Sequence, residues 1–282
     1  MKKRKLKTEK CIKIIILFSF LLFSCSGSID NNVSEKLTGK EIISLLDTLE
    51  ISKRENKIFD IIVDKNIPSF LEKFFEIKVT HTIENKSYEL LYYVTPDYYS
   101  LGIDKDYFLI PMTPILAQKV ANYYDAILPT KKIVDQIYEQ STIKYFPQPI
   151  SPSVAMVTIE VFVAHNDSVI KQRKERFNGY NLSTLASGHK KDVIISNNIY
   201  NNLKQTVPNP VVIYGWHSLD GIPIQPVYNG HSNTYTDYSH GIRLVKNKCK
   251  LNGEDFLLTD ILKDSLLYIL VSDEGPILKP EY

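Results

Sequence analysis

The sequence predicts an α+β fold: a helical N-terminal half that contains a β-hairpin, followed by a mainly antiparallel β domain with few helices. Apolar residues recur at the spacing of an amphipathic helix in residues 39–49 and 54–63. From residue 193 onward, short apolar runs are separated by turn-forming residues, which is typical of strands. The chain has 282 residues, 44% of them hydrophobic, which suffices for one large core or two small ones.

Residues 1–24 have the composition of a signal peptide. The basic segment MKKRKLKTEK precedes an apolar run over residues 14–23, which is shorter than the ~20 residues of a membrane span. The run ends in Leu22-Phe23-Ser24-Cys25, which resembles the lipobox of bacterial lipoproteins, although Phe23 stands where a smaller residue is usual. The resemblance implies cleavage before Cys25 and lipidation of Cys25. An uncleaved signal anchor is the alternative.

Lipidation of Cys25 would anchor the protein to a bacterial membrane in the cell envelope, in the periplasm or at the surface, with the lipid bilayer as its partner. Residues 25–37 are polar and would form the tether. Removal of residues 1–24 takes away seven cations and one anion and changes the formal net charge from +2 to −4. The basicity belongs to the signal peptide, so no nucleic-acid partner is expected. Cys249 is then the one thiol that is neither removed nor lipidated, so no disulfide framework is expected.

The N-terminal region, residues 38–145, is predicted to combine helices with a hairpin. Thr38 can cap the first helix, and Thr113 followed by Pro114 can open a later one, because proline is tolerated in the first helical turn. The expected elements are helices at 39–49, 54–63 and 68–75, a hairpin over 77–96 with its turn at 84–86, a strand at 108–112, and helices at 113–125 and 130–138.

The segment YFPQPISPS, residues 145–153, holds three prolines and predicts a boundary between the two regions. A helix over residues 153–174 follows, with His165 on its polar face, although β-branched residues in its first half also fit a strand. The rest of the 152–282 domain is predicted to be β-rich. Its expected elements are strands at 193–195, 211–214, 222–227, 241–246 and 266–272, and a short helix at 257–263.

Four of the six histidines fall between residues 189 and 240, on segments that follow separate strands. A rigid scaffold presents a cleft on such loops, and a histidine beside a carboxylate suits an oriented base or a metal ligand. We therefore expect a catalytic group that consists of His189, Asp192, His217, His231, Asp237 and His240. Predicted substrate contacts are Trp216, Gln225, Tyr238 and Arg243.

The cofactor remains open at the level of sequence. His231, Asp237 and His240 could converge on one water or one divalent ion, and zinc would suit such ligands. No HExxH motif is present. Ser239 and His240 are neighbours, so strand alternation would separate their side chains and disfavour a serine–histidine nucleophile.

Two resemblances involve this stretch. Tyr238-Ser239-His240-Gly241-Ile242-Arg243-Leu244 resembles the Ser-His-Gly-Cys-Ile-Arg-Leu signature of bacterial L,D-transpeptidases, but Ile242 follows Gly241 where the nucleophilic cysteine belongs. That resemblance implies a degenerate relative in which Arg243 binds a carboxylate and thioester chemistry is lost. The segments GHKKD, YGWHSLDGIPIQP and DYSHGIRLV together resemble a family of secreted or lipid-anchored bacterial proteins. The second resemblance implies one coherent domain over 152–282 and no particular reaction.

Two functions are compatible with these features. One is an extracytoplasmic hydrolase that acts on cell-envelope peptide or glycan through a His/Asp cleft. The other is a non-catalytic cell-surface lipoprotein that binds carbohydrate or peptidoglycan, in which some of the 18 tyrosines could stack on sugars. Convergence of at least three of the four clustered histidines on one ligand or cleft would favour the enzyme.

Overall fold

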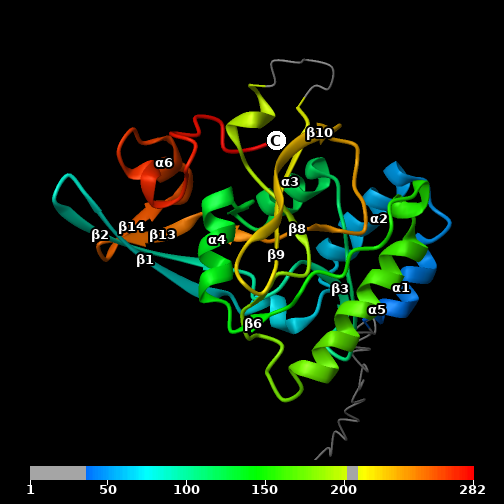
Figure 1. Cartoon of the computed structure of the whole chain (residues 1–282). Helices are drawn as coiled ribbons and strands as arrows, with labels where there is room; N and C mark the ends of the chain where they lie inside the picture. Colours follow the sequence, from blue (N-terminus) through cyan, green and yellow to red (C-terminus); the bar gives the residue numbers. More distant parts are fainter. Residues whose placement is uncertain (1–35, 202–208) are drawn as a thin grey trace, which may run out of the picture. The chain divides into compact units, whose positions relative to one another are not determined.

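The computed structural model describes residues 36–201 and 209–282, and residues 36–282 group into one compact unit. The predicted signal peptide, Cys25 and nearly all of the predicted tether lie outside the described residues. Within the described ranges, no helix is long and apolar enough to cross a membrane. Helices and mainly antiparallel strands coexist in this unit, which confirms the α+β fold class (Figure 1).

The chain of this unit begins with helices α1 (Gly39–Leu46) and α2 (Ile51–Val63). Thr38 Oγ1 accepts a hydrogen bond from the Glu41 amide at 3.3 Å, and the Glu41 carboxylate accepts one from the Thr38 amide at 2.8 Å. This reciprocal capping box fixes the start of α1, as expected from Thr38. The predicted helix over 68–75 is wrong beyond one turn: it is the 3₁₀ helix η1 (Ser69–Glu72), because Phe75 already pairs with Val94 in a strand.

The larger sheet has six strands and draws on both predicted regions of the chain. Its order is β14-β13-β2-β12-β5, with β1 also paired to β2 as the predicted hairpin. Because β2 pairs with β12 and β13, the hairpin of the N-terminal region is completed by strands that lie more than 150 residues later. The strands are β1 (Phe75–Ile83), β2 (Lys86–Val94), β5 (Ala126–Ile127), β12 (Val245–Lys246), β13 (Lys248–Leu251) and β14 (Glu254–Leu257).

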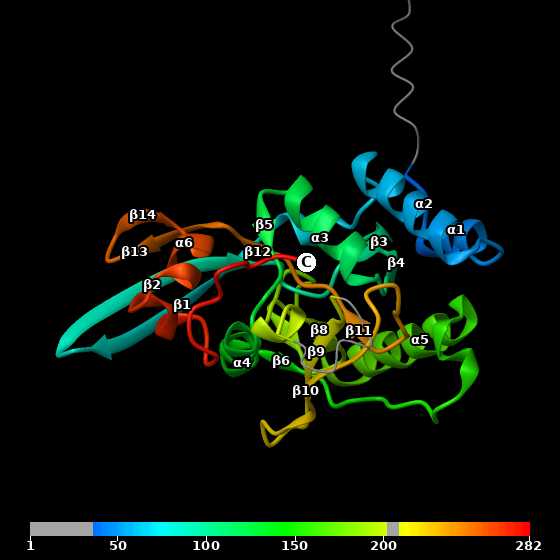
Figure 2. The ribbon, with the colours of Figure 1, turned by 90° about the horizontal axis from the view of Figure 1, so that it is seen from above.

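The smaller sheet carries the segments that the sequence singled out. It comprises β10 (Pro223–His231), β9 (Val211–His217), β8 (Lys191–Val193) and β11 (His240–Gly241), in that order. Its one parallel pair joins β11 to β8 and places His240 opposite Lys191 and Gly241 opposite Asp192. The segments GHKKD and DYSHG therefore lie side by side, and YGWH runs along the other edge of β8 (Figure 2).

Helices α3 (Pro114–Tyr123), α4 (Lys131–Gln140) and α5 (Ile159–Arg176) also contribute to the core. Thr113 and Thr130 cap α3 and α4 through their hydroxyl oxygens, which confirms the predicted proline-led start of α3. The predicted start of α5 at residue 153 is wrong. Residues Val154–Val157 form the 3₁₀ helix η2, and Thr158 caps α5, because its side chain accepts from the Val161 amide.

Several short elements complete the unit. The strand predicted over 266–272 is wrong: after α6 (Leu258–Lys263), the chain forms the 3₁₀ helix η4 (Leu267–Leu270). The carbonyls of Ile269 and Leu270 accept hydrogen bonds from Lys132 and Gln136 of α4, so they need no partner strand. The remaining elements are the pairs β3 (Ser100–Ile103) with β4 (Asp106–Leu109) and β6 (Ile143–Lys144) with β7 (Ala186–Ser187), and the 3₁₀ helix η3 (Asn197–Ile199).

Candidate functional site

Strand β9 bends at Gly215 and Trp216, whose φ angles are +105° and +56°. A positive φ is a true outlier for a residue as large as tryptophan, and such strain concentrates at functional sites. A β-carbon on Gly215 would lie 3.5 Å from Asp192 Oδ2 and 3.5 Å from His217 Cε1. These are ordinary contact distances, so the side chains of Asp192 and His217 both lie beside the backbone of Gly215.

His217 forms an acid–base dyad with Asp135, a residue of α4. His217 Nε2 lies 3.1 Å from Asp135 Oδ1, and the Tyr214 hydroxyl donates to the same oxygen at 2.7 Å. Lys131 donates to Asp135 Oδ2 at 2.9 Å, and Tyr138 stacks on the imidazole with ring centroids 4.4 Å apart. Burial alone would raise the pKa of Asp135, but the hydrogen bonds from His217, Tyr214 and Lys131 lower it, so Asp135 is ionised.

Asp192 is the second carboxylate near His217. Its Oδ2 accepts from the Tyr98 hydroxyl at 2.7 Å, and its Oδ1 lies 4.0 Å from Arg243 Nε and accepts no hydrogen bond from the described residues. Burial raises the pKa of Asp192 to about 6, although Arg243, Tyr98 and His217 oppose the rise. Asp192 and Asp135 thus have pKa values shifted in opposite directions beside one histidine.

His189 belongs to a separate, fully buried pair. Its Nε2 lies 2.9 Å from Asp97 Oδ1, and the rings of Tyr98 and Tyr145 pack on the imidazole with centroids 4.7 and 4.4 Å away. Burial lowers the pKa of His189; the pKa of Asp97 is also lowered, because the charges and hydrogen bond of its neighbours outweigh burial. The pair is therefore a neutral imidazole that donates to a carboxylate, an arrangement that holds Asp97 and His189 in the core.

A third set, which we call the lysine–histidine group, consists of His165, Lys190, Lys191, Trp216, Tyr238 and His240. The His165 ring lies 6.3 Å from Trp216 and 5.1 Å from Tyr238. Lys190 Nζ donates to the Tyr238 carbonyl at 2.5 Å, and Lys191 Nζ lies 5.1 Å from the centre of the Trp216 ring. Burial lowers the pKa of Lys190 to about 7 and that of His240 to about 4.

His231, Asp237 and His240 assemble around the ring of Tyr235. His231 stacks on that ring at 4.1 Å, the His240 ring lies 5.8 Å away, and the Tyr235 hydroxyl donates to Asp237 Oδ2 at 3.1 Å. Asp237 Oδ1 accepts from the amide and hydroxyl of Ser239, so this serine is held by Asp237 and makes no hydrogen bond to His240 among the described residues. A serine–histidine nucleophile is therefore not formed, as expected from their adjacency.

The convergence of three clustered histidines on one ligand, which was expected to favour an enzyme, is not formed by the described side chains. His189 pairs with Asp97, His217 with Asp135, and only His231 and His240 meet around Tyr235. Across residues 36–201 and 209–282, no group of three or more histidine, cysteine, aspartate or glutamate side chains could hold a metal ion. The zinc site considered from the sequence is thus not formed by these side chains, and we derive no step through a metal.

The four predicted substrate contacts lie in three different places in the structure. Trp216 and Tyr238 join the lysine–histidine group. Arg243 is 1% exposed and donates to the carbonyls of Thr95 and Ala186 at 2.8 and 2.7 Å. Its guanidinium therefore binds backbone carbonyls in the core and not a ligand carboxylate. Gln225 lies on the edge strand β10, where its amide donates to the Pro226 carbonyl.

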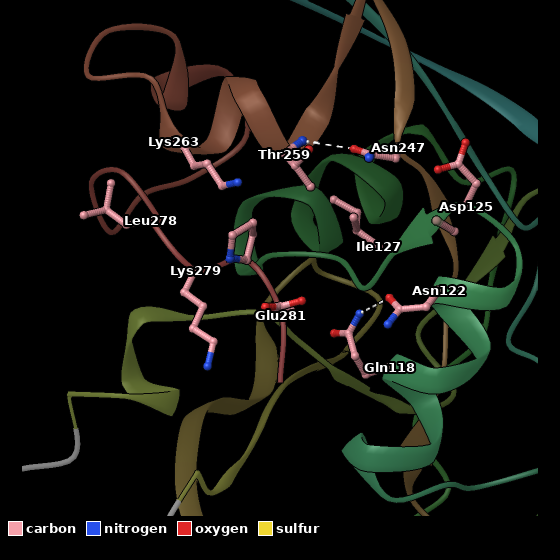
Figure 3. A pocket seen from close by; sticks show the side chains of 12 residues that line it. Gln118, Asn122, Asp125, Ile127, Asn247, Thr259, Lys263, Leu278, Lys279 and Glu281 are labelled. Atoms are coloured by element: carbon pink, nitrogen blue, oxygen red, sulfur yellow. Dashed lines mark hydrogen bonds between the residues drawn. The ribbon is translucent and has the colours of Figure 1, made fainter.

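Surface pockets lie elsewhere on the unit. The pocket in Figure 3 has a volume of about 390 Å³ and is bordered by α3, α6 and the segment 278–281, with none of the candidate residues in its lining. A larger pocket of about 600 Å³ includes Asn166 and Arg173 of α5. Arg173 donates to the Tyr145 hydroxyl at 3.1 Å, and Tyr145 packs on His189, so this pocket contacts the buried pair indirectly.

Several residues of the site were missed by sequence reasoning. Asp97 and Asp135 lie far from the histidine cluster in sequence, and only tertiary contacts reveal their role. Lys190, which was not among the predicted site residues, is 1% exposed, and His165, expected on a polar helix face, is 0% exposed. The adjacent Asn166, which bonds the Leu109 amide, marks the same inward-facing side of α5.

Comparisons with known proteins add no relative: no family model, no curated protein and no solved structure matches this chain.

Proposed function

We propose that this protein is a hydrolase of the cell envelope that acts on peptide or glycan by general acid–base catalysis. His217 is the proposed base, and Asp135 orients it. The observation that carries this proposal is the His217–Asp135 dyad, in which the Asp135 side chain is 29% exposed and therefore reaches solvent. Expected lipidation of Cys25 supports an envelope substrate and the lipid bilayer as partner.

The hydrogen bond assigns the tautomer of His217. Because Asp135 is ionised, it accepts the Nε2 proton, which leaves the Nδ1 lone pair as the proton acceptor. A water that gives its proton to Nδ1 attacks the scissile bond, and Asp135 stabilises the imidazolium that forms. The leaving group takes its proton from Asp192, and the Nδ1 proton of His217 then passes through solvent to the Asp192 carboxylate, so both side chains return to their starting states.

Asp192 is suited to the opposite role. A pKa of about 6 leaves part of the Asp192 population protonated near neutral pH, and its Oδ1 has no protein donor. Two carboxyl groups whose pKa values are driven apart by their surroundings are the usual sign of separate acid and base roles. We assign Asp192 as the proton donor that assists departure of the leaving group.

A thioester route is not part of this proposal. Gly241 is followed by Ile242, and Cys249 lies on β13 with 3% exposure. Burial raises the pKa of the Cys249 thiol to about 12, so it is not a thiolate near neutral pH. The L,D-transpeptidase resemblance therefore supports at most a shared scaffold with different chemistry.

Hydrolysis of peptidoglycan fragments by the purified protein tests the proposal. His217→Ala and Asp135→Asn are expected to lower kcat/KM by about 100-fold or more, which is typical for loss of a general base. His81→Ala is the matched control, because His81 is exposed on β1 and is expected to leave activity unchanged. Activity that resists a chelator agrees with the dyad, whereas equal activity of wild type and H217A would overturn it.

A non-catalytic binding lipoprotein is the second candidate, and the edge strand β10 favours it. Ile222, Ile224 and Tyr228 are exposed along this edge hairpin, in an arrangement that could contact an extended polymer. Co-sedimentation with insoluble peptidoglycan would test this function. Binding that is lost in Ile224→Ser and Tyr228→Ser, without any hydrolysis by wild type, would favour the binding protein over the enzyme.

A further inference from the structure

The lysine–histidine group holds a concentration of buried polar atoms without partners. Within residues 36–201 and 209–282, both ring nitrogens of His165 and of His240 and the indole nitrogen of Trp216 have no hydrogen-bond partner, and all three side chains are at most 4% exposed. Thr236 Oγ1, on the same turn as Tyr238, is also unpaired. Buried polar groups are almost always satisfied, so such a cluster indicates a partner that is not a protein side chain.

The charges of the group identify the sign of that partner. In the described part of the chain, neither Lys190 nor Lys191 forms an ion pair with a carboxylate, although Lys190 is fully buried. The charge of Asp237 acts on both lysines, but its carboxylate oxygens already accept hydrogen bonds from Ser239 and Tyr235. Two ammonium groups and a tryptophan N–H, which can only donate, favour an anion over a neutral ligand.

We propose that the lysine–histidine group binds a carboxylate, and that this carboxylate is part of the substrate of the proposed hydrolase. Lys190, Trp216 and His240 are the proposed donors. Within the group, the planar rings of Trp216, Tyr238 and His165 pack against one another. We expect a small planar anion to fit beside these rings. The inference rests on the proposed function for its substrate class, but carboxylate binding itself requires no turnover.

The site is placed for this role by the backbone of β9. Trp216 and His217 are consecutive, so the strained bend that brings His217 to Asp135 also brings Trp216 to His165 and Lys191. The proposed base, His217, and one proposed carboxylate donor, Trp216, are thus adjacent residues of β9. Anchoring of a terminal carboxylate would fix the position of a neighbouring scissile bond.

Anion binding would also change the protonation of Lys190 and His240. Burial lowers the pKa values of Lys190 and His240, and a bound anion would oppose that effect and favour their charged forms. In the imidazolium form both nitrogens of His240 donate, so an anion can satisfy atoms that otherwise have no partner.

Acetate, with acetamide as its neutral isostere, is the probe that tests the proposal. Trp216 is the only tryptophan, so its emission reports this group alone. With chloride holding the ionic strength constant, acetate is expected to change the emission saturably and to raise the melting temperature, whereas acetamide and inorganic phosphate do neither. Lys190→Met is expected to weaken acetate binding at least tenfold, whereas Lys250→Met, at an exposed lysine, leaves it unchanged.

The outcomes separate the two proposals. Equal responses to acetate and acetamide, or unchanged acetate affinity in a folded K190M, would overturn the carboxylate site. A stronger response to phosphate than to acetate would overturn the assignment of a carboxylate. If K190M does not fold, the wild-type melting-temperature comparison decides. Acetate binding that persists in an inactive H217A supports the site independently of turnover, whereas hydrolysis without acetate binding leaves the hydrolase and removes this inference.

Discussion

Tyr98 donates its hydroxyl hydrogen to Oδ2 of Asp192 at 2.7 Å, although 94 positions separate the two residues. Tyr98 follows the six-stranded sheet, and Asp192 lies on β8 of the four-stranded sheet. The same tyrosine ring packs on His189 and lies 4.4 Å below the Arg243 guanidinium. This one hydrogen bond therefore ties the proposed acid to the buried pair and to both sheets.

Tyr98→Phe is expected to raise the pKa of Asp192 above its value of about 6, because the hydroxyl favours the carboxylate. Loss of a buried hydrogen bond should also lower the free energy of unfolding by about 1–3 kcal/mol. Urea denaturation measures the second effect, and carboxyl NMR titration measures the first. Tyr93→Phe is the matched control, because the Tyr93 hydroxyl bonds Glu76 in an exposed position. Equal losses in the two variants would contradict the assigned role of Tyr98.

Lys190→Met is expected to stabilise the protein near neutral pH. The pKa of Lys190 is about 7 in the folded protein, against 10.5 for an ordinary lysine. Between these values the unfolded chain binds a proton that the folded chain does not, so wild-type stability falls as pH drops from 10.5 to 7. The slope is at most about 1.4 kcal/mol per pH unit. In acetate-free buffer, the stability advantage of K190M over wild type should grow from pH 10 to pH 7, and an advantage that does not vary with pH would contradict it.

Gly188→Ala is expected to be more destabilising than Gly253→Ala. Both glycines have positive φ angles, +93° and +87°, so both variants carry the backbone penalty. A β-carbon on Gly188 would lie 2.4 Å from the Tyr145 carbonyl oxygen, whereas one on Gly253 meets nothing within 4 Å. The clash should cost about 1–3 kcal/mol more in thermal or urea unfolding. Similar unfolding free energies for both variants would show that the Tyr145 contact relaxes freely.

Cys25→Ala is expected to abolish lipid attachment, because the lipobox resemblance places the acceptor thiol at this residue. Metabolic labelling with a fatty acid should mark the wild type and the control variant Cys11→Ala, whose change lies within the predicted signal peptide. A C25A protein that remains labelled would refute the anchor.

Helix caps and the hairpin, which depend on residues close together in the chain, were predicted well from the sequence. Thr38 and Thr113 cap helices as expected, and the hairpin of β1 and β2 appears where alternation placed it. These features depend on neighbours a few residues apart, which one sequence contains. The strand predicted over 266–272 failed, because apolar runs buried by a helix look like strands when the covering helix is unknown.

The histidines were expected on loops that follow strands, but His217, His231 and His240 lie within β9, β10 and β11, and the partners of His217 and His189 were not predicted. The partner of His217 is Asp135 on α4, and the partner of His189 is Asp97, 92 residues away. Such pairs arise from packing of distant elements, which no spacing rule encodes. Burial of His165 and Lys190 was missed for a related reason: a polar residue type predicts exposure unless a tertiary network compensates it.

The pairing of β2 with β12 and β13 determines how late in synthesis the six-stranded sheet can be completed. During synthesis the β1–β2 hairpin is complete long before residues 245–251 exist, and β11 meets β8 only after most of the domain has been made. Long-range pairing of this kind slows folding and leaves strand edges open meanwhile. A chain that must pass through a membrane unfolded benefits from such a delay. For the exported lipoprotein that we propose, this topology would delay closure of the six-stranded sheet until the final quarter of the chain has been synthesised.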